Sequence, residues 1–206
     1  FNIVGEEWSM NPAIVSYWQK GKVNSDNYVN YLPGLMDFPL QNAVSKALNN
    51  EETWGTGLIE LYEALANDFL YPNAENLVIF PDNHDMSRFY VQVREDFDLL
   101  KMGIAFFLTS RGITQIYYGT EILMRHKGDE HGNIRADFPG GWKDDKINAF
   151  TGEGLSANQK EMQNYISVIQ NWRKNKPVIH NGKLIHFAPE NGIYVYFRYD
   201  NNDKIM

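Results

Sequence analysis

The sequence predicts an α/β chain that forms half of a (β/α)8 TIM barrel, followed by the beginning of an all-β C-terminal domain. Two patterns in its 206 residues favour this fold: short apolar segments alternate four times with helical segments, and the final segment contains strands alone. In addition, each of the four predicted barrel strands ends in an acidic residue. A whole barrel takes about 250 residues, whereas only about 175 precede the β-only tail.

The predicted barrel strands are short apolar runs that lead into polar loops. They are the first eight residues, where the strand is expected to be buried, and residues 32–38, 77–80 and 113–118. The predicted helices cover residues 13–20, 40–48, 57–69, 98–110 and 156–174. Asn11 and Pro12 are typical of a helix N-terminus, and Ser156 with Gln159 forms a capping box. Apolar stripes run along two helices: Leu58, Leu61, Tyr62, Leu65 and Phe69 on one, and Met162, Tyr165, Ile166, Ile169 and Trp172 on the other.

The last part of the chain changes character. Residues 121–151 are rich in Gly, Asp, Asn and Pro and predict a long loop, which is usually functional at that length. Strands at 184–187 and 193–197 are joined by a hairpin signal ending at Gly192, and residues 203–206 begin another strand. We assign residues 1–176 to the half-barrel and residues 177–206 to the start of a β-sandwich. Because both ends fall inside predicted strands, we expect a piece of a longer protein.

A flavodoxin-like doubly wound sheet is the alternative fold. It is disfavoured because no Gly-rich phosphate-binding turn follows the first strand. The large insertion after the fourth strand also suits the loops at the catalytic face of a barrel.

Composition excludes several classes of partner. The 19 basic and 26 acidic residues leave a net charge of −7 without a basic block, so we expect no nucleic acid partner. The apolar runs are too short for a membrane span, so none is expected. The absence of Cys excludes disulfides and Cys-ligated metals.

Acidic residues at the ends of the strands are the candidate site. Barrel enzymes carry their chemistry at the C-terminal ends of strands, and these ends contain Glu6 and Glu7, Asp37, Asp85 with its neighbour His84, and Glu121. Along the first strand, Asn2, Val4 and Glu6 share one face, and Phe1, Ile3 and Glu7 share the other. Because the larger apolar residues suit the helix-packed layer, Glu6 is predicted to point into the barrel mouth.

Three segments resemble motifs of the α-amylase family of glycoside hydrolases, in the same order and on successive predicted strands. They are Gly5-Glu6-Glu7-Trp8, similar to the strand-5 motif, Phe80-Pro-Asp82-Asn83-His84-Asp85, similar to the strand-7 motif, and Gly112-Ile-Thr-Gln-Ile-Tyr117-Tyr118-Gly119-Thr-Glu121, similar to the strand-8 segment. The segment from Arg135 to Trp142, with Asp144 and residues 148–150, resembles the strand-8 loop of the neopullulanase and cyclomaltodextrinase subgroup. The resemblance covers essentially the whole chain and makes it the second half of the barrel.

The resemblance implies retaining cleavage of α-glucosidic bonds, which uses two carboxyl groups about 5 Å apart. Glu6 matches the family's general acid/base. Asp85 matches the third acid, which holds sugar hydroxyls and favours the distorted, oxocarbenium-like ring, and His84 matches the residue that hydrogen-bonds the same sugar. To these we add Trp8 as a stacking surface and Arg88 as a site-ordering cation that binds the substrate region. The expected ligand is an α-glucan oligosaccharide.

The family's nucleophile has no counterpart here. It is an Asp at the end of strand 4, and this chain starts at strand 5. The Arg-x-Asp sequence at Arg135 to Asp137 follows strand 8 in a polar loop, so it is not the nucleophile. This stretch alone is therefore expected to be inactive. It is also expected to need the missing N-terminal half of the barrel or a homodimer partner, because half a barrel leaves two sheet edges bare.

Other acidic and histidine residues have ordinary interpretations. Asp37 is expected to be structural or to belong to a distal subsite. The spacing of His126, Asp129, Glu130 and His131 fits no standard metal site, so no metal and no cofactor are predicted. Calcium is common in the family, and its usual ligands lie upstream of this chain.

Several functional questions stay open. A non-catalytic glucan-binding or protein-binding relative, or a glycosyltransferring or isomerising one, is the alternative function. The sequence does not separate hydrolysis from transfer, cyclic from linear substrates, or endo from exo action. The compartment is open as well, with a periplasmic or extracellular location favoured over a cytoplasmic one.

Overall fold

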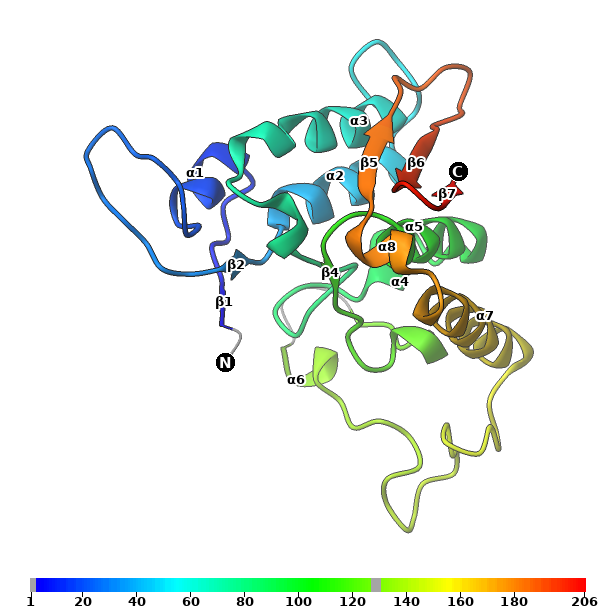
Figure 1. Ribbon diagram of the computed structural model, residues 1–206. Helices are drawn as coiled ribbons and strands as arrows, with labels where there is room; N and C mark the ends of the chain where they lie inside the picture. Colours follow the sequence, from blue (N-terminus) through cyan, green and yellow to red (C-terminus); the bar gives the residue numbers. More distant parts are fainter. Residues whose placement is uncertain (1–2, 127–130) are drawn as a thin grey trace. The chain divides into compact units, whose positions relative to one another are not determined.

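The computed structural model describes residues 3–126 and 131–206 (Figure 1). These residues form two compact units. The first unit contains the described residues up to Phe80, together with Thr109–Gln115 and Lys176–Met206. The second unit contains the described residues of Pro81–Leu108 and Ile116–Asn175. Phe1 and Asn2, on which part of the strand-parity prediction depends, lie outside the described residues.

Four parallel strands form the centre of the first unit. They are β1 (Val4–Gly5), β2 (Gly34–Leu35), β3 (Val78–Ile79) and β4 (Ile113–Thr114). β1 pairs with β2 and β3 with β4, and a parallel bridge from Met36 to Val78 joins the two pairs. The spatial order is therefore the sequence order, as in a (β/α)8 barrel, whereas a flavodoxin-like sheet places its first strand between the second and third.

The strands are shorter than the sequence predicts. Residues 32–38 were expected to form one strand, yet β2 stops at Leu35. The reason is that the Asp37 side chain accepts a hydrogen bond from the Leu40 amide (3.0 Å), which starts a helix at Phe38. The prediction of a buried first strand was also wrong, because Ile3 and Val4 are exposed.

Helices and short 3₁₀ turns connect the strands of the first unit. They are α1 (Pro12–Tyr17), α2 (Phe38–Asn49), α3 (Leu58–Ala66), η1 (Asn67–Leu70), η2 (Ala74–Asn76) and α8 (Pro177–Asn181). α2 and α3 pack side by side (Figure 1). The cap at Asn11 is confirmed, because its side chain accepts a hydrogen bond from the Ala13 amide (2.9 Å).

Apolar residues from several of these elements form a small core. Val15, Leu35, Tyr71 and Leu77 are buried together, and Trp18 packs against them. The predicted stripe on the helix at 57–69 holds for Leu61 and Leu65, which are buried. It fails for Phe69, which is 80% exposed, because α3 ends at Ala66 and the 3₁₀ turn η1 changes the side-chain direction.

A three-stranded antiparallel sheet ends the chain. It consists of β5 (Lys183–His186), β6 (Tyr196–Tyr199) and β7 (Lys204–Ile205), in that order. The predicted hairpin between the first two strands is confirmed, with Asn191 at φ 53° and Gly192 at φ 72° in its turn. Arg198 on β6 is buried and pairs with Glu75 (3.0 Å), which ties this sheet to the segment before β3.

The second unit is helical. It contains α4 (Phe89–Gln92), nearly all of α5 (Phe97–Thr109), η3 (Thr120–Ile122), α6 (His131–Ile134) and α7 (Ala157–Lys174). The capping box at Ser156 is confirmed, and Met162 and Ile166 are the buried part of the predicted α7 stripe. Tyr165 on α7 donates a hydrogen bond to the Lys101 carbonyl of α5 (3.2 Å). Across the described ranges, no helix is both long and apolar enough to span a bilayer.

Candidate active site

The predicted site residues fall on both units. Glu6 and Trp8 belong to the first unit, whereas His84, Asp85 and Arg88 belong to the second.

Glu6 follows directly from β1 and is exposed. Its strand is held in place because the Gly5 carbonyl accepts a hydrogen bond from the Met36 amide (3.0 Å). The neighbouring Glu7 is half-buried, and its carboxylate accepts a hydrogen bond from the Ser9 amide (3.2 Å). Glu7 is thus engaged in shaping the loop, whereas the Glu6 carboxylate is open to solvent.

Trp8 lies against an aromatic cluster. Its ring packs on Phe38 with centroids 4.3 Å apart, and Phe38 in turn packs edge-on against Phe80 at 5.0 Å. Phe38 and Phe80 are fully buried, while Trp8 remains 42% exposed. The arrangement supports the ring from one side and leaves part of it accessible to a ligand.

His84 and Asp85 form the core of the site in the second unit. The His84 Nε2 atom lies 3.1 Å from the Asp85 carboxylate, and the Asp85 side chain is 30% exposed. The Asp85 amide donates a hydrogen bond to the Asn83 side chain (2.8 Å), so the turn after β3 is locally ordered. The structure therefore brings together the two residues that the sequence assigned to the same sugar.

Two residues from the long loop approach the same carboxylate. The Nη2 atom of Arg135 donates a hydrogen bond to Asp85 Oδ1, and its Nε atom donates to the His84 carbonyl (3.1 Å). His131 Nδ1 lies 3.6 Å from the same Asp85 oxygen. Asp85 is thus surrounded by one arginine and two histidines, of which the sequence identified only His84.

Arg88 contacts the backbone next to Arg135. It is fully buried, and its guanidinium donates hydrogen bonds to the carbonyls of Tyr118 (2.5 Å) and Ile134 (2.7 Å). The same group stacks over the Tyr117 ring at 4.1 Å. This geometry supports the site-ordering role predicted for Arg88, because a buried guanidinium that faces backbone carbonyls orders the loop. The prediction that Arg88 also binds substrate needs correction, because the side chain is fully buried.

Asp82 is a buried acid that the sequence reasoning passed over. Its carboxylate accepts hydrogen bonds from the Phe89 amide (2.8 Å) and the Thr120 hydroxyl (3.1 Å). Burial raises the pKa of Asp82 from 3.8 to about 6, although these hydrogen bonds and the charge of Arg88 act in the opposite direction. Asp82 therefore links the turn after β3 to the start of α4 and to η3.

Glu121 shares this environment. Its carboxylate accepts a hydrogen bond from the Gly119 amide (2.7 Å), and burial is the main cause that raises its pKa. Asp37 lies elsewhere, buried in the first unit against Arg111 (2.7 Å), so the structural interpretation of Asp37 holds over the distal-subsite one.

The described residues contain no group of three or more His, Asp or Glu side chains arranged to hold a metal ion. Asp129 and Glu130, two of the four residues weighed as metal ligands in the sequence, lie outside the described residues.

Arg135 is the main residue that sequence reasoning missed. Its motif was visible, but 50 positions separate it from Asp85, and no local pattern reports such a contact. The one available signal was its place in the loop that follows strand 8, because loops at one end of a barrel converge on the same site.

Comparison with protein families finds two matches that together cover the whole chain. Residues 1–188 match the family described as alpha amylase, catalytic domain, and residues 184–206 match the cyclo-malto-dextrinase C-terminal domain. An alpha-amylase from Niallia circulans is 31% identical over 173 residues, which cover 84% of this chain and 29% of that protein. A cyclomaltodextrin glucanotransferase from the same organism is 32% identical over 164 residues, which cover 80% of this chain and 20% of that protein.

Solved structures agree on the fold. The alpha-amylase of Geobacillus thermoleovorans, solved with acarbose, superposes with a TM-score of 0.72 at 24% identity. A cyclic α-maltosyl-(1→6)-maltose hydrolase from Arthrobacter globiformis superposes with a TM-score of 0.73 at 16% identity. Each match covers 98% of this chain and 40% of the other, so the chain corresponds to part of a barrel.

The chain spans 15–29% of the length of the first curated relatives that it matches. The match to the alpha amylase catalytic domain nevertheless covers residues 1–188, which is far more than half of this chain. Together with four parallel strands in sequential order and the His84–Asp85 pair beyond β3, this match shows that the chain belongs to the α-amylase family of glycoside hydrolases.

Proposed function

We propose that the protein containing this chain is a retaining glycoside hydrolase that cleaves α-1,4-glucosidic bonds in starch-derived oligosaccharides, cyclomaltodextrins or pullulan. The observation that carries the proposal is the His84–Asp85 pair, which is partly exposed just beyond β3. Glu6, exposed just beyond β1, supports it, because barrel enzymes place their catalytic groups at strand ends.

The proposed roles follow the two-carboxyl chemistry of retaining enzymes. Glu6 donates a proton to the leaving oxygen and later activates water, while Asp85 and His84 hold hydroxyl groups of the sugar that becomes oxocarbenium-like. The nucleophile is supplied by a part of the protein that this chain does not contain. We propose residues 1–176 as the barrel part and residues 177–206 as the start of the C-terminal domain.

Transfer of the glycosyl group to another sugar is the second candidate, because several relatives are cyclomaltodextrin glucanotransferases. We favour hydrolysis with a neopullulanase-like or cyclomaltodextrinase-like preference, which the match of residues 184–206 supports. Product analysis of the full-length protein with maltoheptaose, cyclomaltodextrins and pullulan separates the two, since transfer produces oligosaccharides longer than the substrate.

The decisive variant is Glu6→Gln in the full-length protein. Loss of general-acid help is expected to lower kcat on maltotriose by a factor of about 10²–10⁴. The loss on α-maltosyl fluoride is expected to be smaller, because fluoride leaves without a proton from the enzyme. NMR of the first product formed by the unmodified protein should show the α-anomer, as retention requires.

Glu7→Gln is the matched control. It changes the adjacent acid in the same way, yet the glutamine oxygen can still accept the hydrogen bond from the Ser9 amide. We expect this variant to keep nearly full activity. Equal activity of Glu6→Gln and the unmodified protein would end the role assigned to Glu6.

The isolated chain is proposed to be inactive, because it lacks the nucleophile. Calorimetry with maltoheptaose then asks whether this part alone binds glucan. If the full-length protein binds maltoheptaose without releasing product, the non-catalytic binding function replaces the hydrolase.

A further inference from the structure

Asp85 is held by an arginine that comes from a distant part of the chain. Arg135 uses two nitrogen atoms of its planar guanidinium: Nη2 donates to Asp85 Oδ1, and Nε donates to the His84 carbonyl (3.1 Å). The other carboxylate oxygen, Oδ2, faces His84 Nε2 at 3.1 Å. The fork geometry of arginine thus fixes both the backbone and the carboxylate of the motif that follows β3.

The backbone on both sides of Arg135 is anchored. The carbonyl of Ile134 accepts a hydrogen bond from the buried guanidinium of Arg88 (2.7 Å). The carbonyl of Ala136 accepts one from the Tyr118 hydroxyl (2.8 Å). In a long loop, these two contacts hold the one residue between them in place. The arrangement is pre-organised, because Arg88 itself is locked by its contacts with Tyr117 and Tyr118.

The contact leaves Asp85 able to bind a ligand. A carboxylate oxygen can accept more than one hydrogen bond, and the Asp85 side chain remains 30% exposed. Arg135 and His84 therefore restrict the rotation of the carboxylate without covering it. Such restraint is valuable in catalysis, because a small displacement of a group that contacts the transition state can cost about 10²-fold in rate.

We propose that Arg135 is a positioning residue for the reaction: it holds the Asp85 carboxylate in the orientation that receives the hydroxyl groups of the distorted sugar. This inference rests on the proposed function, since it needs Asp85 to contact the substrate. The inference extends the site from the motif that follows β3 to the loop that follows β4. In this arrangement, the buried Arg88 holds that loop in place through its hydrogen bond to the Ile134 carbonyl.

The test uses the full-length protein with Arg135→Gln and Arg135→Lys. Arg135→Gln removes the paired guanidinium hydrogen bonds to Asp85 and the His84 carbonyl. This variant is expected to lower kcat on maltotriose by about 10- to 100-fold. KM is expected to change less than about threefold, because the restraint acts mainly in the transition state. Arg135→Lys keeps the positive charge and is expected to recover part of the loss. Arg125→Gln is the matched control, since Arg125 lies in the same loop and pairs with the exposed Glu95 (2.7 Å).

A double-mutant cycle with Asp85→Asn separates positioning from loop stability. If Arg135 acts through Asp85, the double variant is no slower than Asp85→Asn alone. If Arg135 only stabilises the loop, its loss lowers the melting temperature and leaves kcat/KM as in the Arg125→Gln control, and this result overturns the inference. A double variant that is slower than Asp85→Asn by the full factor lost in Arg135→Gln also overturns it, because Arg135 then acts independently of Asp85.

The proposed function and this inference fail in different ways. An unmodified full-length protein that neither cleaves nor binds maltooligosaccharides overturns both. An unmodified protein that is active, with Arg135→Gln as fast as Arg125→Gln, overturns the inference alone. A full-length protein that binds maltoheptaose without turnover also overturns both, because the inference concerns the orientation of Asp85 during the reaction.

Discussion

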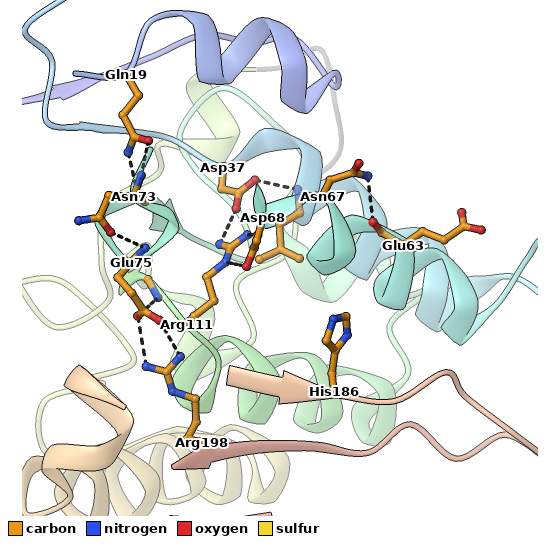
Figure 2. A network of polar contacts seen from close by, with 12 residues as sticks. Gln19, Asp37, Glu63, Asn67, Asp68, Asn73, Glu75, Arg111, His186 and Arg198 are labelled. Atoms are coloured by element: carbon orange, nitrogen blue, oxygen red, sulfur yellow. Dashed lines mark hydrogen bonds and ion pairs between the residues drawn. The ribbon is translucent and has the colours of Figure 1, made fainter. Parts of the chain in front are cut away.

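Arg111 donates a hydrogen bond to Asp37 over 2.7 Å, and both side chains are buried (Figure 2). The same guanidinium also donates to Asp68 through Nε (2.8 Å) and Nη2 (2.5 Å). Asp37 caps α2 and Arg111 precedes β4, so this network joins a helix start to a strand start within the first unit. Burial is the main cause that raises the pKa of Asp68.

Arg111→Gln is expected to be strongly destabilising. Removing the arginine leaves the buried Asp37 and the partly buried Asp68 without their common cation, and breaking a buried ion pair in this way typically costs about 3–5 kcal/mol. Thermal unfolding followed by circular dichroism measures the effect. The double variant Arg111→Gln/Asp37→Asn should lose less than the sum of the single variants, and strictly additive losses would contradict the pairing.

Gly34→Ala is expected to destabilise β2 by about 1–3 kcal/mol. A Cβ atom at Gly34 would lie 2.3 Å from the Asn76 carbonyl oxygen, which belongs to the backbone and cannot rotate away. Gly55→Ala is the control, because a Cβ atom there meets nothing within 4 Å. Urea unfolding of the two variants should show a lower midpoint for Gly34→Ala only.

Asp82 is expected to make stability depend on pH. The pKa of Asp82 is about 6 in the folded protein and 3.8 ordinarily. Between these two pH values, the folded state therefore holds a proton that the unfolded chain has released. The stability that this proton contributes is complete below about pH 4 and is lost as the pH rises through 6. At about 1.4 kcal/mol for each pH unit, the change is roughly 3 kcal/mol.

Asp82→Asn removes this titration. The difference in unfolding free energy between the unmodified protein and this variant should therefore shift between pH 4 and pH 7, in favour of the variant at the higher pH. Asp144→Asn, a change of an exposed loop carboxylate, serves as the reference. Parallel stability curves for the unmodified protein and Asp82→Asn would contradict the assignment.

Ser156→Ala is expected to weaken the start of α7 by about 1 kcal/mol. The Ser156 hydroxyl accepts a hydrogen bond from the Gln159 amide (3.3 Å), and Gln159 returns one by accepting from the Ser156 amide (2.9 Å). Gln159 also donates to the Ile122 carbonyl (2.9 Å), so the cap supports η3 as well. Ser156→Asp should retain the stability, and hydrogen exchange of the first α7 turn distinguishes the two variants.

Local signals in the sequence predicted the elements that depend on neighbouring residues. The caps at Asn11 and Ser156 lie where expected, because each requires only a side chain and an amide two or three positions away. Strand ends were predicted less well. The apolar run up to Phe38 was predicted as a single strand. In the structure, the Asp37 side chain caps a helix that begins at Phe38, so the last residue of the run is helical.

The sequence by itself determined the α/β alternation, the β-only tail, and the family to which the motifs around Glu6 and Asp85 belong. These features are legible because they depend on periodicity and on short motifs. Only the tertiary structure decided that Arg88 is buried under the loop, that Arg135 holds Asp85, and that Arg111 joins Asp37 to Asp68. Each of these contacts joins residues at least 30 positions apart. Arg88 and Arg111 are buried, where an unpaired charge is costly. Arg135 meets the partly exposed Asp85 because the fold brings its loop to that carboxylate.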